Sequence, residues 1–139
     1  MKGWAPGGVL KALAGLCLIA GLSACAAVVA GGVLGGGGVI YEKGRLSQTL
    51  NASVPRAHAA TVAALKDLHM PIIEDRHDSL TARMKSRLAT GEDVRIGMDY
   101  ATADTSKVSI RIGVLGDRAK SLMIFERIRA ELKRLPRPD

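Results

Sequence analysis

Three consecutive stretches between residues 80 and 114 alternate apolar and polar side chains, and this alternation restricts the fold more than any other feature. In the clearest stretch the alternate apolar positions are Val94, Ile96, Met98 and Tyr100. Side chains at every second position share one face of a β-strand, so each stretch predicts a strand with one buried face. The buried positions expected in the other two stretches are Leu80, Ala82, Met84 and Leu88, then Val108, Ile110, Ile112 and Val114.

Two segments with helical spacing flank these strands. Asn51 or Ser53 is expected to cap the first helix, with Pro55 in its first turn and an end near Leu68. Its predicted buried side is Val54, Ala57, Thr61, Val62, Leu65 and Leu68. The second helix begins at Gly116-Asp117 and ends before Pro136, with an apolar side of Leu122, Phe125, Ile128, Leu132 and Leu135.

Two shorter strands complete the expected order of elements. Residues Tyr41 to Leu50 alternate weakly and predict an edge strand, and Ile72 to Asp75 predict a strand that enters a turn at Arg76 to Ser79. Two amphipathic helices are available to cover one apolar sheet face. The sequence therefore predicts an α+β fold: a two-layer sandwich whose antiparallel sheet of about four to five strands carries both helices on one face.

The first residues of the chain have the pattern of an export signal. A basic segment from Met1 to Lys11 precedes an apolar run from Ala12 to Leu22, which ends in Leu22-Ser23-Ala24-Cys25. This ending resembles the lipobox of bacterial lipoproteins. The resemblance implies that Cys25 receives a diacylglycerol and an N-acyl chain after cleavage before it. No other cofactor is expected. Alanine at position 26 implies the outer membrane rather than the inner one, with the protein facing the periplasm.

These features divide the chain into four parts: a signal peptide (1–24), a lipidated cysteine with a glycine-rich tether (25–44), an α+β domain (45–135) and a tail (136–139). The formal net charge is +7. Removing the signal peptide takes away only Lys2 and Lys11, so the excess of positive charge remains and favours polyanionic partners. Nucleic acid is not expected as a partner, because an exported protein rarely meets it.

Two alternatives concern the apolar and glycine-rich segments. The stretch from Val9 to Ala30 is long enough to be an uncleaved transmembrane helix. Small residues also recur at a spacing of four in the stretch Ala26 to Ile40, which would permit close helix–helix contact and self-association. Because four consecutive glycines disfavour a helix, a flexible tether is the preferred interpretation of that stretch.

Several stretches together resemble a family of small Gram-negative lipoproteins of unknown function. They are the lipobox, the glycine-rich stretch, Tyr41 to Leu46, Ala63 to Leu68 and Ile110 to Asp117. The resemblance covers most of the mature chain and implies its architecture. It brings no catalytic residues.

The polar face of the predicted sheet collects basic side chains. Five are expected to project there: Arg83, Lys85, Arg87, Arg95 and Arg111. Only Asp99 is expected to oppose them. One hypothesis is an anion-binding platform for lipid A phosphates, phospholipid headgroups or acidic envelope polymers. An envelope protein is a separate candidate partner. The other is an ordinary solvated face, whose charges discourage edge pairing.

The remaining polar residues give little support for catalysis or metal binding. On one helix, His58 and His69 would lie about 16 Å apart at 1.5 Å rise per residue, too far to share a metal ion. His77 falls in a charged segment that a turn explains equally well, so no metal site is expected. No nucleophile elbow or His–Cys pair is present. We therefore expect a non-enzymatic protein with a structural or binding role in the envelope, or alternatively one that self-associates or perturbs membranes through its glycine-rich segment.

Overall fold

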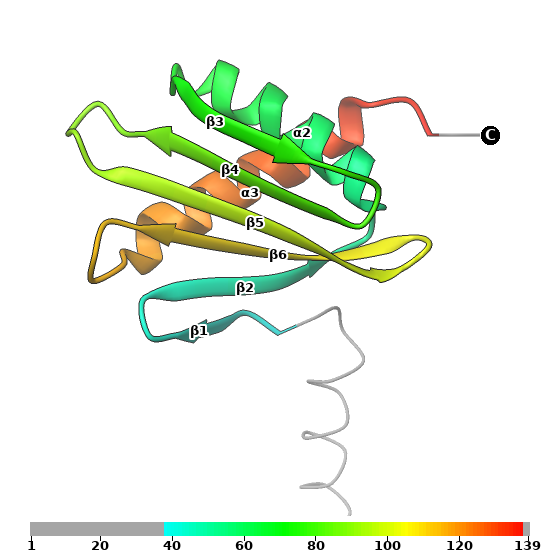
Figure 1. The fold of residues 1–139 in the computed structure, drawn as a ribbon, viewed down its shortest axis with the longest axis horizontal. Helices are drawn as coiled ribbons and strands as arrows, with labels where there is room; N and C mark the ends of the chain where they lie inside the picture. Colours follow the sequence, from blue (N-terminus) through cyan, green and yellow to red (C-terminus); the bar gives the residue numbers. More distant parts are fainter. Residues whose placement is uncertain (1–37, 138–139) are drawn as a thin grey trace, which may run out of the picture. The chain divides into compact units, whose positions relative to one another are not determined.

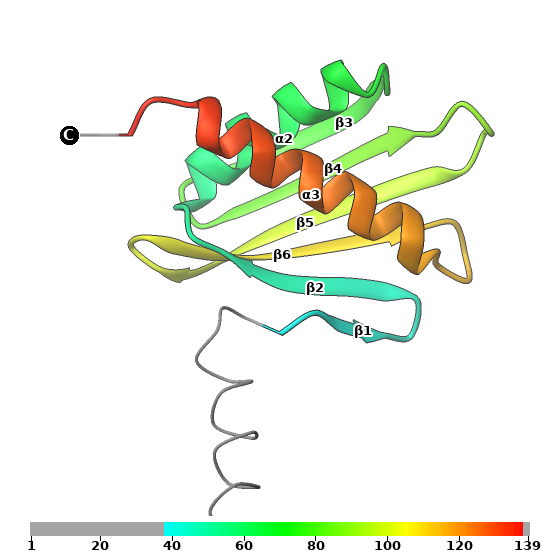
Figure 2. The ribbon, with the colours of Figure 1, turned by 180° about the vertical axis from the view of Figure 1, so that it is seen from behind.

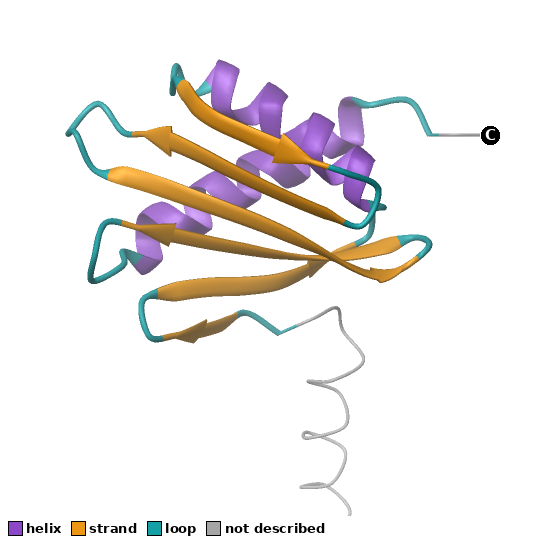
Figure 3. Cartoon of the chain, in the orientation of Figure 1, coloured by secondary structure: helices purple, strands orange, loops and turns teal. Residues whose placement is uncertain are grey.

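A computed structural model describes residues 38–137. In this range the chain forms one six-stranded sheet and two helices (Figure 1). The strands are β1 (Ile40–Glu42), β2 (Arg45–Leu50), β3 (Ile72–His77), β4 (Thr81–Arg87), β5 (Asp93–Thr102) and β6 (Thr105–Ile112). The helices are α2 (Val54–Asp67) and α3 (Arg118–Arg134). Both lie on the same face of the sheet (Figures 2 and 3), which confirms the predicted α+β sandwich.

The sheet is antiparallel throughout, in the order β1-β2-β6-β5-β4-β3. It has six strands rather than four or five, because the single strand predicted over Tyr41 to Leu50 is a hairpin. Lys43 and Gly44 both have positive φ, 51° and 77°, as the two central residues of a type I′ turn do. As a consequence β1 is the edge strand, β2 lies inside the sheet, and the sheet begins within the stretch assigned to the tether.

The core lies between the sheet and the helices, where the predicted alternation of β5 and β6 is confirmed. Residues 94, 96 and 98 of β5 and 108, 110 and 112 of β6 are all buried. Helix α2 faces them with small side chains such as Ala57, Ala60 and Ala64, and α3 contributes Phe125 and Ile128. Helix α2 contacts β3 to β6, while α3 contacts β2, β6 and α2.

Three residues predicted to face the core are instead exposed: Leu80, Tyr100 and Val114. Leu80 precedes β4, in a turn where its N–H donates to the Asp78 carboxylate at 2.7 Å. Tyr100 lies where the β5–β6 pairing shifts register. Val114 follows the end of β6, after a glycine with φ of 62°. The alternation therefore extends past the strand segments that the helices cover.

The ends of the helices also differ in detail from the prediction. Ser53 occupies the N-cap of α2 but its side chain makes no capping bond, whereas Asp117 caps α3 by accepting the Lys120 backbone N–H at 3.0 Å. His69 is not part of α2, because the helix ends at Asp67 and His69 has a left-handed backbone with φ of 55°. Neither described helix combines the length and apolarity needed to cross a membrane.

Candidate anion-binding face

The structure places the five predicted basic side chains on the sheet face that the helices leave uncovered. Strand β4 carries Arg83, Lys85 and Arg87, while β5 carries Arg95 and β6 carries Arg111. The residues on either side of each point toward the core; on β4, for example, Ala82, Met84 and Ser86 are buried. The period of two in these strands thus separates an apolar face from a basic one.

Strand pairing aligns three of these five residues with a further arginine, Arg45, in one row across the sheet. Arg45 pairs with Arg111, Arg111 with Arg95, and Arg95 with Lys85. We refer to Arg45, Arg111, Arg95 and Lys85 as the cation row. Sequence reasoning missed Arg45, because its place beside Arg111 depends on β2 joining the interior of the sheet.

A hollow of about 490 Å³ lies over this row. Gly97 and Ser109 are opposite each other in the neighbouring row and form part of its lining. A side chain at position 97 would fill the space, because its Cβ would lie 2.8 Å from Ser109 Oγ and 3.4 Å from Arg83 Nη1. The charged lining residues are six basic and two acidic: Arg45, Arg76, Arg83, Lys85, Arg95, Arg111, Glu74 and Asp99.

Some of these cations have carboxylate partners and others do not. Arg83 binds Asp99 at 2.6 Å, and Asp93 binds both Lys85 at 3.2 Å and Arg87 at 3.1 Å. The expectation that Asp99 alone opposes the basic residues is therefore wrong, because β5 begins one residue earlier than its apolar pattern indicated. Hydrogen bonds from Lys85 and then Arg87 hold the pKa of Asp93 below its ordinary value.

The centre of the hollow keeps uncompensated positive charge. Within residues 38–137, the lining residues Arg45, Arg76, Arg95 and Arg111 form no ion pair with a carboxylate. Arg111 donates instead to the backbone carbonyl of Val114. Guanidinium groups present parallel N–H donors that match the oxygens of phosphates and carboxylates. The chemistry that this surface offers is anion binding.

A second polar cluster lies on the helix side of the sheet, and it was not predicted. His58 of α2 meets Asp75 and His77 of β3, with the two imidazole rings stacked at a centroid distance of 3.9 Å. The prediction placed residues 76–79 in a turn, whereas β3 continues through His77. The signal in the sequence was an aspartate and a histidine at alternate positions of a strand, after a helix that carries another histidine.

The predicted signal peptide, the lipidation site Cys25 and most of the tether lie outside the described residues, as does most of the segment proposed to self-associate. The match to a known protein family extends further along the chain than the described residues do. A family model described as a protein of unknown function (DUF3568) matches residues 9–131. That range contains the Leu22 to Cys25 motif, all six strands and most of α3. No curated protein matches the chain.

Proposed function

Since the chain belongs to the DUF3568 family, whose function is unknown, we propose that it is a lipid-anchored envelope protein that binds phosphate-bearing anions in the hollow over the cation row. The Leu22 to Cys25 motif supports the anchor and a location facing the periplasm, and alanine at position 26 favours the outer membrane over the inner one. In this proposal the protein has a binding role and no catalytic one.

The observation that carries the binding proposal is the contrast between the cation row and its neighbours. Elsewhere on the same face, opposite charges mostly face each other: Arg87 pairs with Asp93, and Asp99 pairs with Lys107, although Arg76 lies opposite Arg83. The two ends of the row also have acidic neighbours, with Glu42 opposite Arg45 and Glu74 opposite Lys85. An ordinary solvated face would be balanced in this way throughout. The row instead sets three successive pairs of cations directly opposite one another, an arrangement that destabilises a sheet. A bound anion would compensate this charge.

The shape of the site suits a small anionic group rather than a flat polymer contact. Its volume of about 490 Å³ is that of an ordinary small-molecule pocket. Gly97 has no side chain, so the hollow stays open near this residue. Arginines from β2, β5 and β6 also line the hollow. Free phosphates and lipid headgroups share the phosphate chemistry that such donors recognise.

The binding test uses the full chain in a neutral detergent, titrated calorimetrically with inorganic tripolyphosphate and, separately, with dihexanoyl phosphatidic acid. We expect Arg95→Gln/Arg111→Gln to weaken binding at least about 30-fold, because each hydrogen bond to a charged group contributes about 1.5–3 kcal/mol. The matched control is Lys66→Gln/Lys133→Gln, which removes the same charge from exposed positions on the two helices. It should bind like the wild type.

Equal losses in the two double variants would mean that only net charge matters, and the proposal would be wrong. The thermal stability of the Arg95→Gln/Arg111→Gln protein serves as a folding control, and it should equal or exceed that of the wild type at low salt. Tight binding of the phosphatidic acid alone would assign the hollow to lipid headgroups, and tight binding of tripolyphosphate as well would assign it to phosphates in general.

The anchor is tested by Cys25→Ser. We expect this variant to lose attached lipid and either to leave the membrane fraction or to keep its signal peptide uncleaved, because a serine hydroxyl does not form the thioether that the thiol forms. The measurement is fractionation of cells labelled with a radioactive fatty acid. Cys17→Ser, in the apolar run, is the control and should keep both label and location. A Cys25→Ser protein that stays in the membrane with no loss of lipid label would support an uncleaved transmembrane helix instead.

A further inference from the structure

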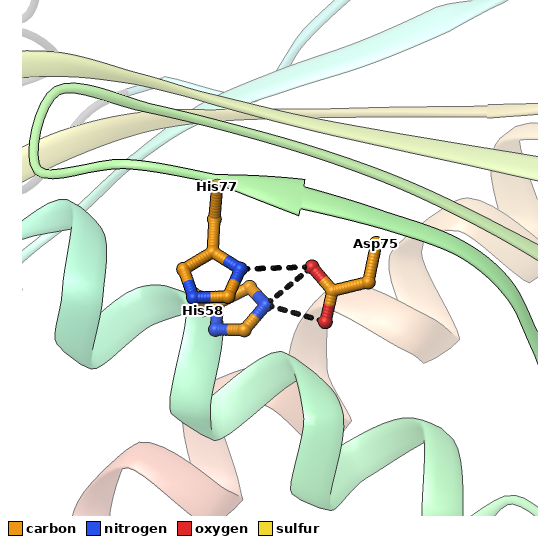
Figure 4. Close-up of side chains that lie close together, drawn as sticks. All are labelled: His58, Asp75 and His77. Atoms are coloured by element: carbon orange, nitrogen blue, oxygen red, sulfur yellow. Dashed lines mark hydrogen bonds and ion pairs between the residues drawn. The ribbon is translucent and has the colours of Figure 1, made fainter.

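At one edge of the sheet, on the face opposite the hollow, two histidines and an aspartate converge (Figure 4). His58 Nε2 lies 2.8 and 2.9 Å from the two Asp75 carboxylate oxygens, and His77 Nδ1 lies 3.1 Å from Oδ1. The three ligand atoms that these residues offer all lie within 4.8 Å of one another. Both rings direct a nitrogen at the same carboxylate (Figure 4).

The fold explains why these side chains meet. Alternate residues of β3 point to opposite faces, so Glu74 and Arg76 line the hollow while Asp75 and His77 face α2. Helix α2 passes beside this edge strand and presents His58, whose side chain is only 12% exposed. His77 is 51% exposed and leaves the cluster open to solvent on one side.

We propose that His58, Asp75 and His77 bind a first-row divalent cation of the Zn²⁺ type, with water in a fourth position. Imidazole nitrogen and carboxylate oxygen are Zn²⁺ ligands, and sets of two histidines and one carboxylate are known for zinc. At Zn–N and Zn–O distances of about 2.0–2.2 Å, tetrahedral ligand atoms lie about 3.3 Å apart. The present N–O separations need to widen by only a few tenths of an ångström.

The charges around Asp75 differ from those around most other carboxylates of the described residues. Asp67, Asp93 and Asp99 each pair with an arginine or lysine. In the part of the chain that the structure describes, the partners of Asp75 are His58 and His77 alone. Within the described residues, Asp75 therefore has no lysine or arginine partner and lies beside two imidazoles, a residue type that binds metal ions through a ring nitrogen.

The experiment measures Zn²⁺ and Co²⁺ binding to the full chain in neutral detergent, after treatment with EDTA. All proteins carry Cys17→Ser and Cys25→Ser, so that thiolates do not contribute. We expect one bound ion per chain, a higher unfolding temperature with Zn²⁺, and the visible absorption of tetrahedral Co²⁺. His77→Ala and Asp75→Asn should each weaken binding at least about tenfold, since even the loss of an outer partner of a ligand costs 10–100-fold.

His69→Asn is the matched control, because it removes the third histidine at an exposed position whose left-handed backbone asparagine tolerates. It should bind Zn²⁺ like the parent protein. Unchanged binding in His77→Ala and Asp75→Asn, or an equal loss in His69→Asn, would overturn the proposal. Unfolding temperatures measured in EDTA test whether each variant is folded. If either His77→Ala or Asp75→Asn fails to fold, the remaining variant of the two decides the result.

Discussion

Replacing Gly116 by alanine is expected to destabilise the protein by about 3 kcal/mol or more, through left-handed strain and overpacking together. Gly116 has φ of 84°, and a Cβ at this position would lie 2.6 Å from the carbonyl carbon of Gly44. Gly44 is equally constrained, since its own Cβ would lie 2.9 Å from the carbonyl carbon of Leu115. The β1–β2 turn and the loop before α3 thus meet backbone to backbone. Chemical denaturation measures the effect.

Gly91→Ala separates the two contributions. Gly91 has φ of 91°, similar to that of Gly116, but no atom lies within 4 Å of the position of its Cβ. It therefore carries the backbone strain without the steric overlap, and we expect a loss of about 1 kcal/mol. If Gly116→Ala cost no more than Gly91→Ala, the close approach of the two loops would be of no energetic importance.

Phe125→Ala is expected to have an effect of similar size in the core, a loss of about 3–5 kcal/mol. Phe125 is the single phenylalanine of the chain and is 1% exposed, on the side of α3 that faces the sheet. Its aliphatic neighbours cannot collapse fully into the space that it fills. Because small proteins are stable by only about 5–15 kcal/mol, the unfolding midpoint should fall sharply.

Phe125→Leu keeps an apolar side chain at the same position and should lose less than half as much stability. Both variants are compared by urea denaturation, and their m-values should match that of the wild type. A small loss in Phe125→Ala, equal to that of Phe125→Leu, would contradict the placement of this side chain in the core.

Much of the fold could be predicted because one local pattern decides it. Alternation at Val94, Ile96 and Met98 identifies a strand without reference to any other part of the chain, and the helical spacing around Phe125 does the same for α3. Such patterns also assign faces, which is why the basic residues of β4 to β6 could be placed on the uncovered side. Strand ends were predicted less well, because a pattern of alternation does not show where the covering helices stop.

The features that were missed depend on contacts between distant segments. Arg45 enters the cation row only because β2 pairs with β6, and His58 meets Asp75 only because α2 packs beside β3. No spacing within either segment encodes these pairings. The β1–β2 hairpin was missed for a different reason: Lys43-Gly44 is a weaker turn signal than Asn-Gly or Asp-Gly.

The edge position of β1 determines how the domain responds to tension on the chain that precedes it. Strand β1 pairs with β2 alone, from Ile40 opposite Ser47 to Glu42 opposite Arg45. A force applied to the chain before Ile40 therefore breaks the β1–β2 pairs one after another, starting with Ile40 and Ser47. Release of residues 40–42 adds about 10 Å of chain at about 3.4 Å per residue, while Gly44 stays packed against Leu115 and Gly116. Leu46, where the buried core begins, stays in place. Tension on the preceding chain therefore separates β1 from the sheet before it disturbs the core.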